Sequence, residues 1–122
     1  MLTMPISTEN ADHYSWGGSC DGWHLVRAQG LSVIEERMPA GTAEVKHWHT
    51  RARQFFYVLE GTLLIEVEGV DHELPAGVGL EIKQGLAHQA RNETAQDVRF
   101  LVISSPPHQG DRRDAEADVV PA

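Results

Sequence analysis

Short runs in which apolar and polar residues alternate, separated by glycine and proline, make up most of this chain. Alternation buries one face of a β-strand, whereas a helix needs apolar residues three or four positions apart, and no long stretch has that spacing. Eight segments are predicted to be strands: 24–28, 31–38, 44–49, 54–60, 62–68, 79–82, 88–93 and 98–105. Many short strands without intervening helices indicate an antiparallel sandwich or barrel.

Glycines mark the predicted turns between these strands. Glu60-Gly61-Thr62 and Glu68-Gly69-Val70 predict hairpins, while Pro75-Ala76-Gly77 and Gln84-Gly85 predict further turns. No internal repeat and no linker divides the chain. We therefore expect a single all-β domain.

The two ends of the chain differ in composition from its middle. Residues 1–30 carry three aromatic side chains among glycines and polar residues: Tyr14, Trp16 and Trp23. These aromatics predict an N-terminal segment that packs on the barrel or on a partner subunit. Residues 31–105 hold the predicted barrel, and the proline-flanked, charged residues 106–122 predict a loose acidic tail.

Composition and charge narrow the classes of partner. The 122 residues suffice for one domain with one core. The chain has 18 acidic and 10 basic residues and a net charge of −8, which disfavours binding to nucleic acid. No segment is long enough for a membrane span, and residues 1–5 lack the pattern of a signal peptide. Cys20 is the single cysteine, so we expect a reducing, cytoplasmic location.

The residues most informative about chemistry are His47 and His49. Two histidines at positions i and i+2 of a strand project to the same face. Gln54 follows five residues later, and His88 lies much further along the chain. A third imidazole and a carboxamide oxygen could complete a set of ligands for a first-row divalent metal.

Two spaced sets of residues resemble the two signatures of the cupin superfamily. The first set has glutamine where glutamate is usual: Gly41, His47, His49, Gln54 and Gly61. The second set has lysine where proline is usual: Gly77, Lys83, Gly85, His88 and Asn92. The resemblance spans about residues 31–105. It implies a double-stranded β-helix, which is a small jelly-roll barrel, with a metal in its mouth or interior.

Within the superfamily, the His-x-His-x4-Gln pattern with a later histidine resembles small cupins that linearise unsaturated uronates in pectin breakdown. In those proteins an aspartate and a phenylalanine on the last strand act near the substrate. Val102 and Ser104 stand at the corresponding positions of this chain. The residues expected to line the pocket are Phe56, Val58, Val102 and Ser104.

The neutral amide of Gln54 has a chemical consequence. Three imidazoles and an amide leave the charge of a divalent metal undiminished, so the metal is a stronger Lewis acid than beside a carboxylate. We expect one Zn, Ni, Fe, Mn or Cu ion per chain, bound by His47, His49, Gln54 and His88. Gln54 could instead be a hydrogen-bonding residue beside a three-histidine site.

The function that this site favours is isomerase- or lyase-like chemistry on an oxygen-rich small molecule, such as a sugar acid or keto-acid. Two alternatives are open: an iron- or manganese-dependent dioxygenase, and a non-enzymatic module that binds a small ligand through its metal. Alternation along their strand sends some of Glu35, Glu36 and Arg37 inward, and one inward-facing charged residue could serve as acid or base or could pair across an interface. A homodimer is expected, because small barrels expose sheet edges and apolar faces.

Overall fold

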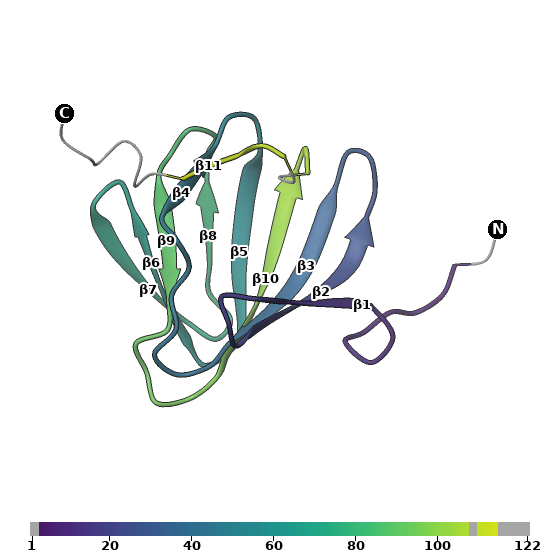
Figure 1. Ribbon diagram of the computed structural model, residues 1–122, viewed down its shortest axis with the longest axis horizontal. Helices are drawn as coiled ribbons and strands as arrows, with labels where there is room; N and C mark the ends of the chain where they lie inside the picture. The colour runs from purple at the N-terminus through teal and green to yellow at the C-terminus, as the bar shows by residue number, and fades with distance from the viewer. Residues whose placement is uncertain (1–2, 108–109, 115–122) are drawn as a thin grey trace.

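The architecture is a barrel-like pair of antiparallel sheets. It is seen in a computed structural model that describes residues 3–107 and 110–114. One sheet has six strands in the order β1-β2-β3-β10-β5-β8, and the other has five in the order β11-β4-β9-β6-β7 (Figure 1). The described residues contain no helix, and therefore none that could span a membrane. The all-β double-stranded β-helix expected from the sequence is confirmed.

The strands are short, and each is bounded by a turn or loop. They are β1 (Asp12–Trp16), β2 (Cys20–Arg27), β3 (Ser32–Met38), β4 (His47–His49), β5 (Arg53–Glu60), β6 (Thr62–Val67), β7 (Val70–Pro75), β8 (Gly79–Ile82), β9 (His88–Arg91), β10 (Val98–Ser105) and β11 (Arg112–Asp114). Each of the eight predicted segments overlaps one of these strands.

The core lies between the two sheets. It is built by the inward positions of alternating strands, such as Phe56 and Val58 on β5 and Phe100 on β10. The rings of Phe56 and Phe100 stack with centroids 5.9 Å apart. Apolar burial of this kind contributes about 25 cal/mol per Å² removed from water, which is the main force holding the sheets together.

Three observed strands, β1, β7 and β11, were not expected from the sequence. All three lie at an edge of a sheet, where one side of the strand has no neighbour. Edge strands bury few side chains: β7 buries only Leu74, and β11 buries none. The apolar alternation that reveals a strand is therefore weak in these segments.

The hairpin between β6 and β7 confirms the turn predicted at Glu68-Gly69. Val67 and Val70 pair across a two-residue loop, and both loop residues have positive φ, 49° at Glu68 and 85° at Gly69. This conformation is a type I′ turn, which follows the twist of the strands that it joins and favours glycine at its second position.

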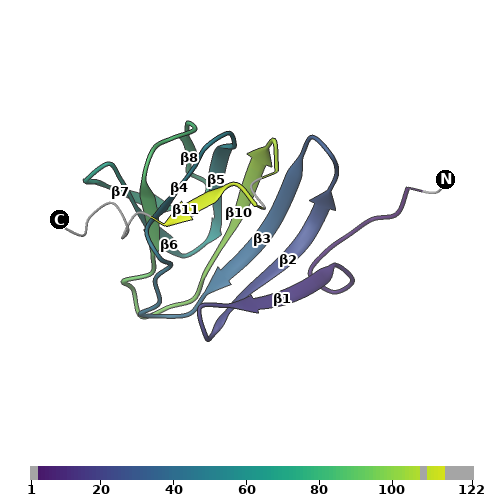
Figure 2. The ribbon, with the colours of Figure 1, turned by 45° about the horizontal axis from the view of Figure 1, so that its top comes forward.

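The strands nearest the two ends of the described chain both join the sheets. β1 and β2 form a hairpin that extends the six-stranded sheet, and β11 lies beside β4 at the end of the other sheet (Figure 2). Within residues 106–122, expected to form a loose tail, residues 112–114 pair with β4 and Asp111 is buried. Residues 108–109 and 115–122 of that segment lie outside the described residues.

Candidate metal centre

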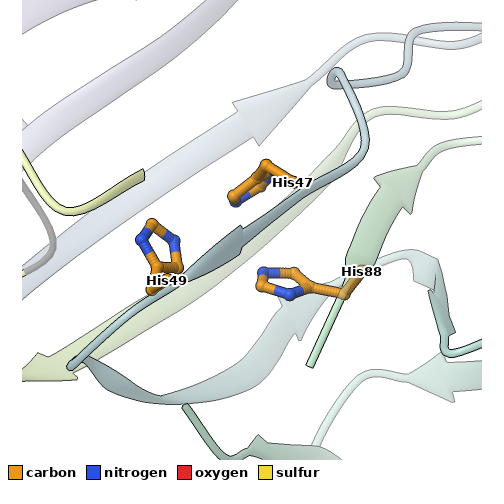
Figure 3. Close-up of side chains that lie close together, drawn as sticks. All are labelled: His47, His49 and His88. Carbon is orange, nitrogen blue, oxygen red and sulfur yellow. The ribbon is translucent and has the colours of Figure 1, made fainter. Parts of the chain in front are cut away.

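Three buried histidines meet at one place between the sheets. His47 and His49 project to the same side of β4, and His88 begins β9, directly opposite His47 in the ladder. One ring nitrogen of each histidine lies within 4.8 Å of the others, and the three rings face one another (Figure 3). The sequence predicted this convergence. Three imidazoles at this spacing could hold a metal ion.

Backbone carbonyls orient two of the rings. Nδ1 of His47 donates to the carbonyl of Val45 at 2.8 Å, and Nδ1 of His88 donates to the carbonyl of Leu86 at 2.9 Å. The proton is therefore on Nδ1, and Nε2 carries the lone pair in both residues. Nε2 of His88 is buried and has no hydrogen-bond partner among the described residues.

Burial also keeps these rings neutral. It lowers the pKa of His47 far below that of a free histidine, and the neighbouring His88 lowers it further. The pKa of His88 is likewise lowered, chiefly by burial. Metals bind the neutral imidazole, so neither His47 nor His88 needs to lose a proton at neutral pH before it can bind one.

Gln54 offers an oxygen to the same cavity. It lies on the inward face of β5 and is 3% exposed. Its Nε2 donates to Oγ of Ser104 on β10 at 3.0 Å. Its Oε1 is buried and accepts no hydrogen bond from the described residues. An unpartnered buried carbonyl oxygen beside a histidine cluster has the chemistry of a metal ligand.

A cavity of about 180 Å³ opens over these residues. Its lining combines polar and aromatic side chains: Tyr14, Trp16, Glu36, Glu44, His47, His49, Gln54, Phe56, Val102 and Arg112. Phe56 and Val102 were expected there. Val58 and Ser104 were also expected to line the pocket, but Val58 packs in the core and Ser104 supports Gln54 from behind.

Four polar residues of the cavity lie outside the predicted site, although Glu36 was one of three charged residues of its strand considered as acid or base. Glu36 shares the inward face of β3 with Ile34 and Met38, so alternation could have selected it over Glu35. Tyr14, Glu44 and Arg112 come from an edge strand, a loop and a second edge strand. Tyr14 alternates with Trp16 on β1, which places both on one face, whereas no pattern around Glu44 and Arg112 indicates which way their side chains point.

The two cavity carboxyl groups titrate near neutral pH. Burial raises the pKa of Glu36 to about 7, against the opposing effects of a hydrogen bond from Tyr14 and the charge of Arg112. Burial and the nearby charge of Glu36 raise the pKa of Glu44 to about 8. Groups with such pKa values can exchange protons under physiological conditions.

Asp111 anchors the loop between the two halves of the site. Its Oδ2 accepts hydrogen bonds from the backbone amides of Arg51 at 2.9 Å and Ala52 at 2.8 Å, and its Oδ1 accepts one from the Thr50 hydroxyl. Burial acts to raise its pKa, but these hydrogen bonds outweigh it and hold the pKa well below the usual range. The loop joins His49 to Gln54, so Asp111 fixes their relative position.

The fold and the histidine cluster together define a small β-barrel with a potential metal site in its cavity. The sequence profile of the cupin domain matches residues 34–104, and the chain belongs to the cupin family. This match confirms the resemblance seen in the two spaced sets of residues.

Known proteins share the fold over most of the chain. KdgF from Halomonas sp. aligns with a TM-score of 0.80 and 20% identity, covering 90% of this chain and 98% of that one. The polyketide cyclase RemF from Streptomyces resistomycificus aligns with a TM-score of 0.79 and 19% identity, covering 93% and 85%. At these identities the likeness shows the fold alone.

A curated relative is more similar in sequence. "Polyketide synthase CurC" from Streptomyces cyaneus is 32% identical over 77 residues, which are 63% of this chain and 47% of that protein. The chain thus spans about half the length of the curated relatives that it matches.

Proposed function

We propose that this cupin is a metalloenzyme that binds one divalent metal through His47, His49, His88 and Gln54. The observation that carries the proposal is a pair of buried, unpartnered acceptors. Oε1 of Gln54 belongs to a residue that lines the cavity with His47 and His49, and Nε2 of His88 belongs to the ring that completes the histidine cluster. Leaving a buried acceptor without a partner costs about 1–3 kcal/mol. Coordination of a metal would offset that cost.

The cavity suits a small, oxygen-rich substrate such as a sugar acid or keto-acid. A divalent metal with only neutral ligands would supply Lewis acidity toward a substrate oxygen. Arg112 lines the cavity, where the part of its guanidinium that does not bond Asp114 and the Val45 carbonyl would donate to a substrate carboxylate. Trp16, Phe56 and Val102 supply an apolar wall that limits access of water. These features support an isomerase- or lyase-like reaction.

The relatives support a substrate with ketone groups. CurC is described as a polyketide synthase and RemF as a polyketide cyclase. A polyketide carries carbonyl groups whose neighbouring carbons readily lose protons, as do those of keto-acids. The same Lewis-acid chemistry therefore serves both classes of compound.

The metal is tested by elemental analysis of protein purified without chelator and then reconstituted with Zn²⁺ and Fe²⁺ in turn. We expect about one ion per chain in the wild type and far less in His88→Ala, since one of four ligands is lost. His72→Ala is the matched control, because His72 lies on β7 and does not line the cavity. Wild-type protein that retains neither metal would contradict the proposal.

The dioxygenase alternative has a separate test. The iron-loaded protein is mixed with a catechol or a β-diketone in an oxygen electrode. We expect no oxygen uptake above that of free iron, because four neutral ligands do not offset the charge of an oxidised iron. Sustained uptake that is abolished in His88→Ala would favour the dioxygenase instead.

We further propose that the chain is a cytoplasmic homodimer. Phe55, Tyr57 and Leu59 lie side by side on the outer face of β5 with about two fifths of their surface exposed. A second copy of the chain would bury this apolar strip. The buried, unpaired Cys20 is consistent with a reducing compartment. Light scattering should give twice the chain mass for the wild type and the chain mass for Tyr57→Lys; a monomeric wild type would contradict the dimer.

A further inference from the structure

Tyr14 and Glu36 form a hydrogen-bonded pair across an intervening strand. In the six-stranded sheet Tyr14 on β1 faces Gly22 on β2, and Gly22 in turn faces Glu36 on β3. The tyrosine hydroxyl donates to Oε2 of Glu36 at 3.1 Å. This contact joins side chains two strands apart, so the tyrosine ring must lie over the strand between them.

Gly22 makes that path possible. A Cβ atom built on Gly22 would lie 2.2 Å from Cζ of Tyr14 and 2.5 Å from its hydroxyl oxygen. These separations are far below van der Waals contact, so any residue with a side chain would displace the ring. The absence of a side chain at Gly22 thus allows the phenol to reach Glu36.

The pair faces the candidate metal centre. Tyr14 and Glu36 line the same cavity as His47, His49 and Gln54. The pair belongs to the six-stranded sheet, whereas His47 and His49 belong to the opposite one. Glu35, the neighbour of Glu36, does not line the cavity and pairs with Arg99 at 3.0 Å. One carboxyl group of β3 is therefore directed toward the space a substrate would occupy.

We propose that Glu36 is the catalytic base of this cavity, that Tyr14 is its positioning residue, and that the substrate is a carbonyl compound with a hydrogen on the adjacent carbon. The inference rests on the proposed metal-dependent function. The Glu36 carboxylate takes that proton: the C–H bond breaks, an O–H bond forms on Glu36, and the C–H electron pair moves toward the carbonyl oxygen. The resulting enolate regains a proton from Glu36 at the same or a neighbouring atom.

The charged surroundings suit such a base. Tyr14 from β1, Glu44 from the loop before β4, Arg112 from β11 and the histidines of β4 face the cavity together with Glu36. Burial brings the pKa of Glu36 to about 7, while the Tyr14 hydrogen bond and Arg112 act to lower it. A base with this pKa is substantially ionised at neutral pH yet still accepts a proton readily.

The test follows exchange of carbon-bound hydrogen in a simple keto-acid. Zinc-loaded protein is incubated with pyruvate in D₂O, and loss of the methyl proton signal is followed by NMR. We expect the wild type and the matched control Glu35→Gln to exchange faster than free Zn²⁺. Glu36→Gln should exchange at least about a hundredfold more slowly, the usual minimum loss for a general base. Zinc content and circular dichroism, measured on each variant, verify that site and fold are intact.

Two further variants test the positioning role. Tyr14→Phe removes the hydrogen bond that favours the Glu36 carboxylate, so the midpoint of the rate–pH profile should move to higher pH. Gly22→Ala should move it in the same direction by displacing the ring. A merely structural role for Tyr14 would lower the rate without moving the midpoint.

The outcomes separate the two proposals. Undiminished exchange by zinc-loaded Glu36→Gln would overturn the inference. So would a wild type that binds zinc without accelerating exchange, and that result would leave the metal site standing. A wild type that fails to bind zinc would overturn the proposed function and the inference together.

Discussion

Nε2 of Gln54 donates a hydrogen bond to Oγ of Ser104, and in this orientation the amide turns its oxygen away from β10. With the nitrogen held by β10, Oε1 is left buried and unpartnered among the described residues. An amide that turned around would present N–H groups to the cavity, and these cannot bind a metal. The orientation of one side chain thus determines whether the cavity offers three neutral donors or four.

Replacing Gln54 with glutamate should strengthen metal binding and weaken the metal as a Lewis acid. The carboxylate adds a negative charge beside the ion, so we expect the Kd for Zn²⁺ to fall about tenfold, equivalent to about 1.4 kcal/mol. The affinity for an anionic ligand such as pyruvate should fall as well. Calorimetric titration measures both, and unchanged values for both would show that Gln54 does not contact the metal.

Removing the Ser104 hydroxyl should weaken metal binding without removing a ligand. In Ser104→Ala the Gln54 amide loses the partner that orients it, and losses of this kind reduce metal affinity about 10- to 100-fold. Ser105→Ala is the matched control, because Ser105 is exposed and its hydroxyl donates to the carbonyl of Gly30. Equal zinc affinities for the two variants would show that the Gln54–Ser104 contact has no role in binding.

The stability of the metal-free protein should depend on pH through Glu36. Its pKa is about 7 in the folded state against 4.5 for the free group, so over this range the unfolded chain binds fewer protons. The protonated Glu36 side chain adds to the free energy of unfolding, and this contribution is therefore lost as the pH rises from about 4.5 to 7. The side chain at position 36 does not titrate in the Glu36→Gln variant, so this variant lacks that pH dependence.

The free energy of unfolding of Glu36→Gln should consequently rise relative to the wild type over that range, by about 1–3 kcal/mol in total. Urea denaturation at several pH values measures the difference, to which Glu44 adds in the same direction because the charge of Glu36 helps to raise the pKa of Glu44. Glu35→Gln, a substitution outside the cavity, is the matched control. A constant difference between Glu36→Gln and the wild type would contradict the raised pKa.

Loss of the Asp111 carboxylate should loosen the loop that joins His49 to Gln54. Asp111→Ala leaves the backbone amides of Arg51 and Ala52 without their acceptor, and we expect destabilisation of about 2–3 kcal/mol. Zinc affinity should fall too, because both ends of the loop carry proposed ligands. Thermal unfolding and zinc titration measure these effects, with exposed Asp114→Ala as control. An Asp111→Ala variant that is destabilised but keeps its full zinc affinity would show that this loop does not position the metal ligands.

Much of the fold and half of the cavity could be predicted from the sequence, because alternation sets the direction of side chains within a strand. The i, i+2 spacing placed His47 and His49 on one face, and the same rule placed Gln54 with Phe56 on the inward face of β5. Asn92 of the second spaced set has a structural role, because its side-chain amide donates to the carbonyls of Met38 and Gln96. Such rules apply within one strand and do not predict which residues of other strands face the same cavity.

The sequence by itself determined the all-β barrel and the histidines that converge in it, because both follow from strand periodicity and the spacing of ligand residues. Only the tertiary structure decided which residues form the opposite wall of the cavity. Tyr14 meets Glu36 over a side chain that Gly22 lacks, and Arg112 arrives on an edge strand with no buried residue. These positions depend on pairing between distant strands, which is fixed by the packing of the whole barrel and leaves no periodic trace in the chain.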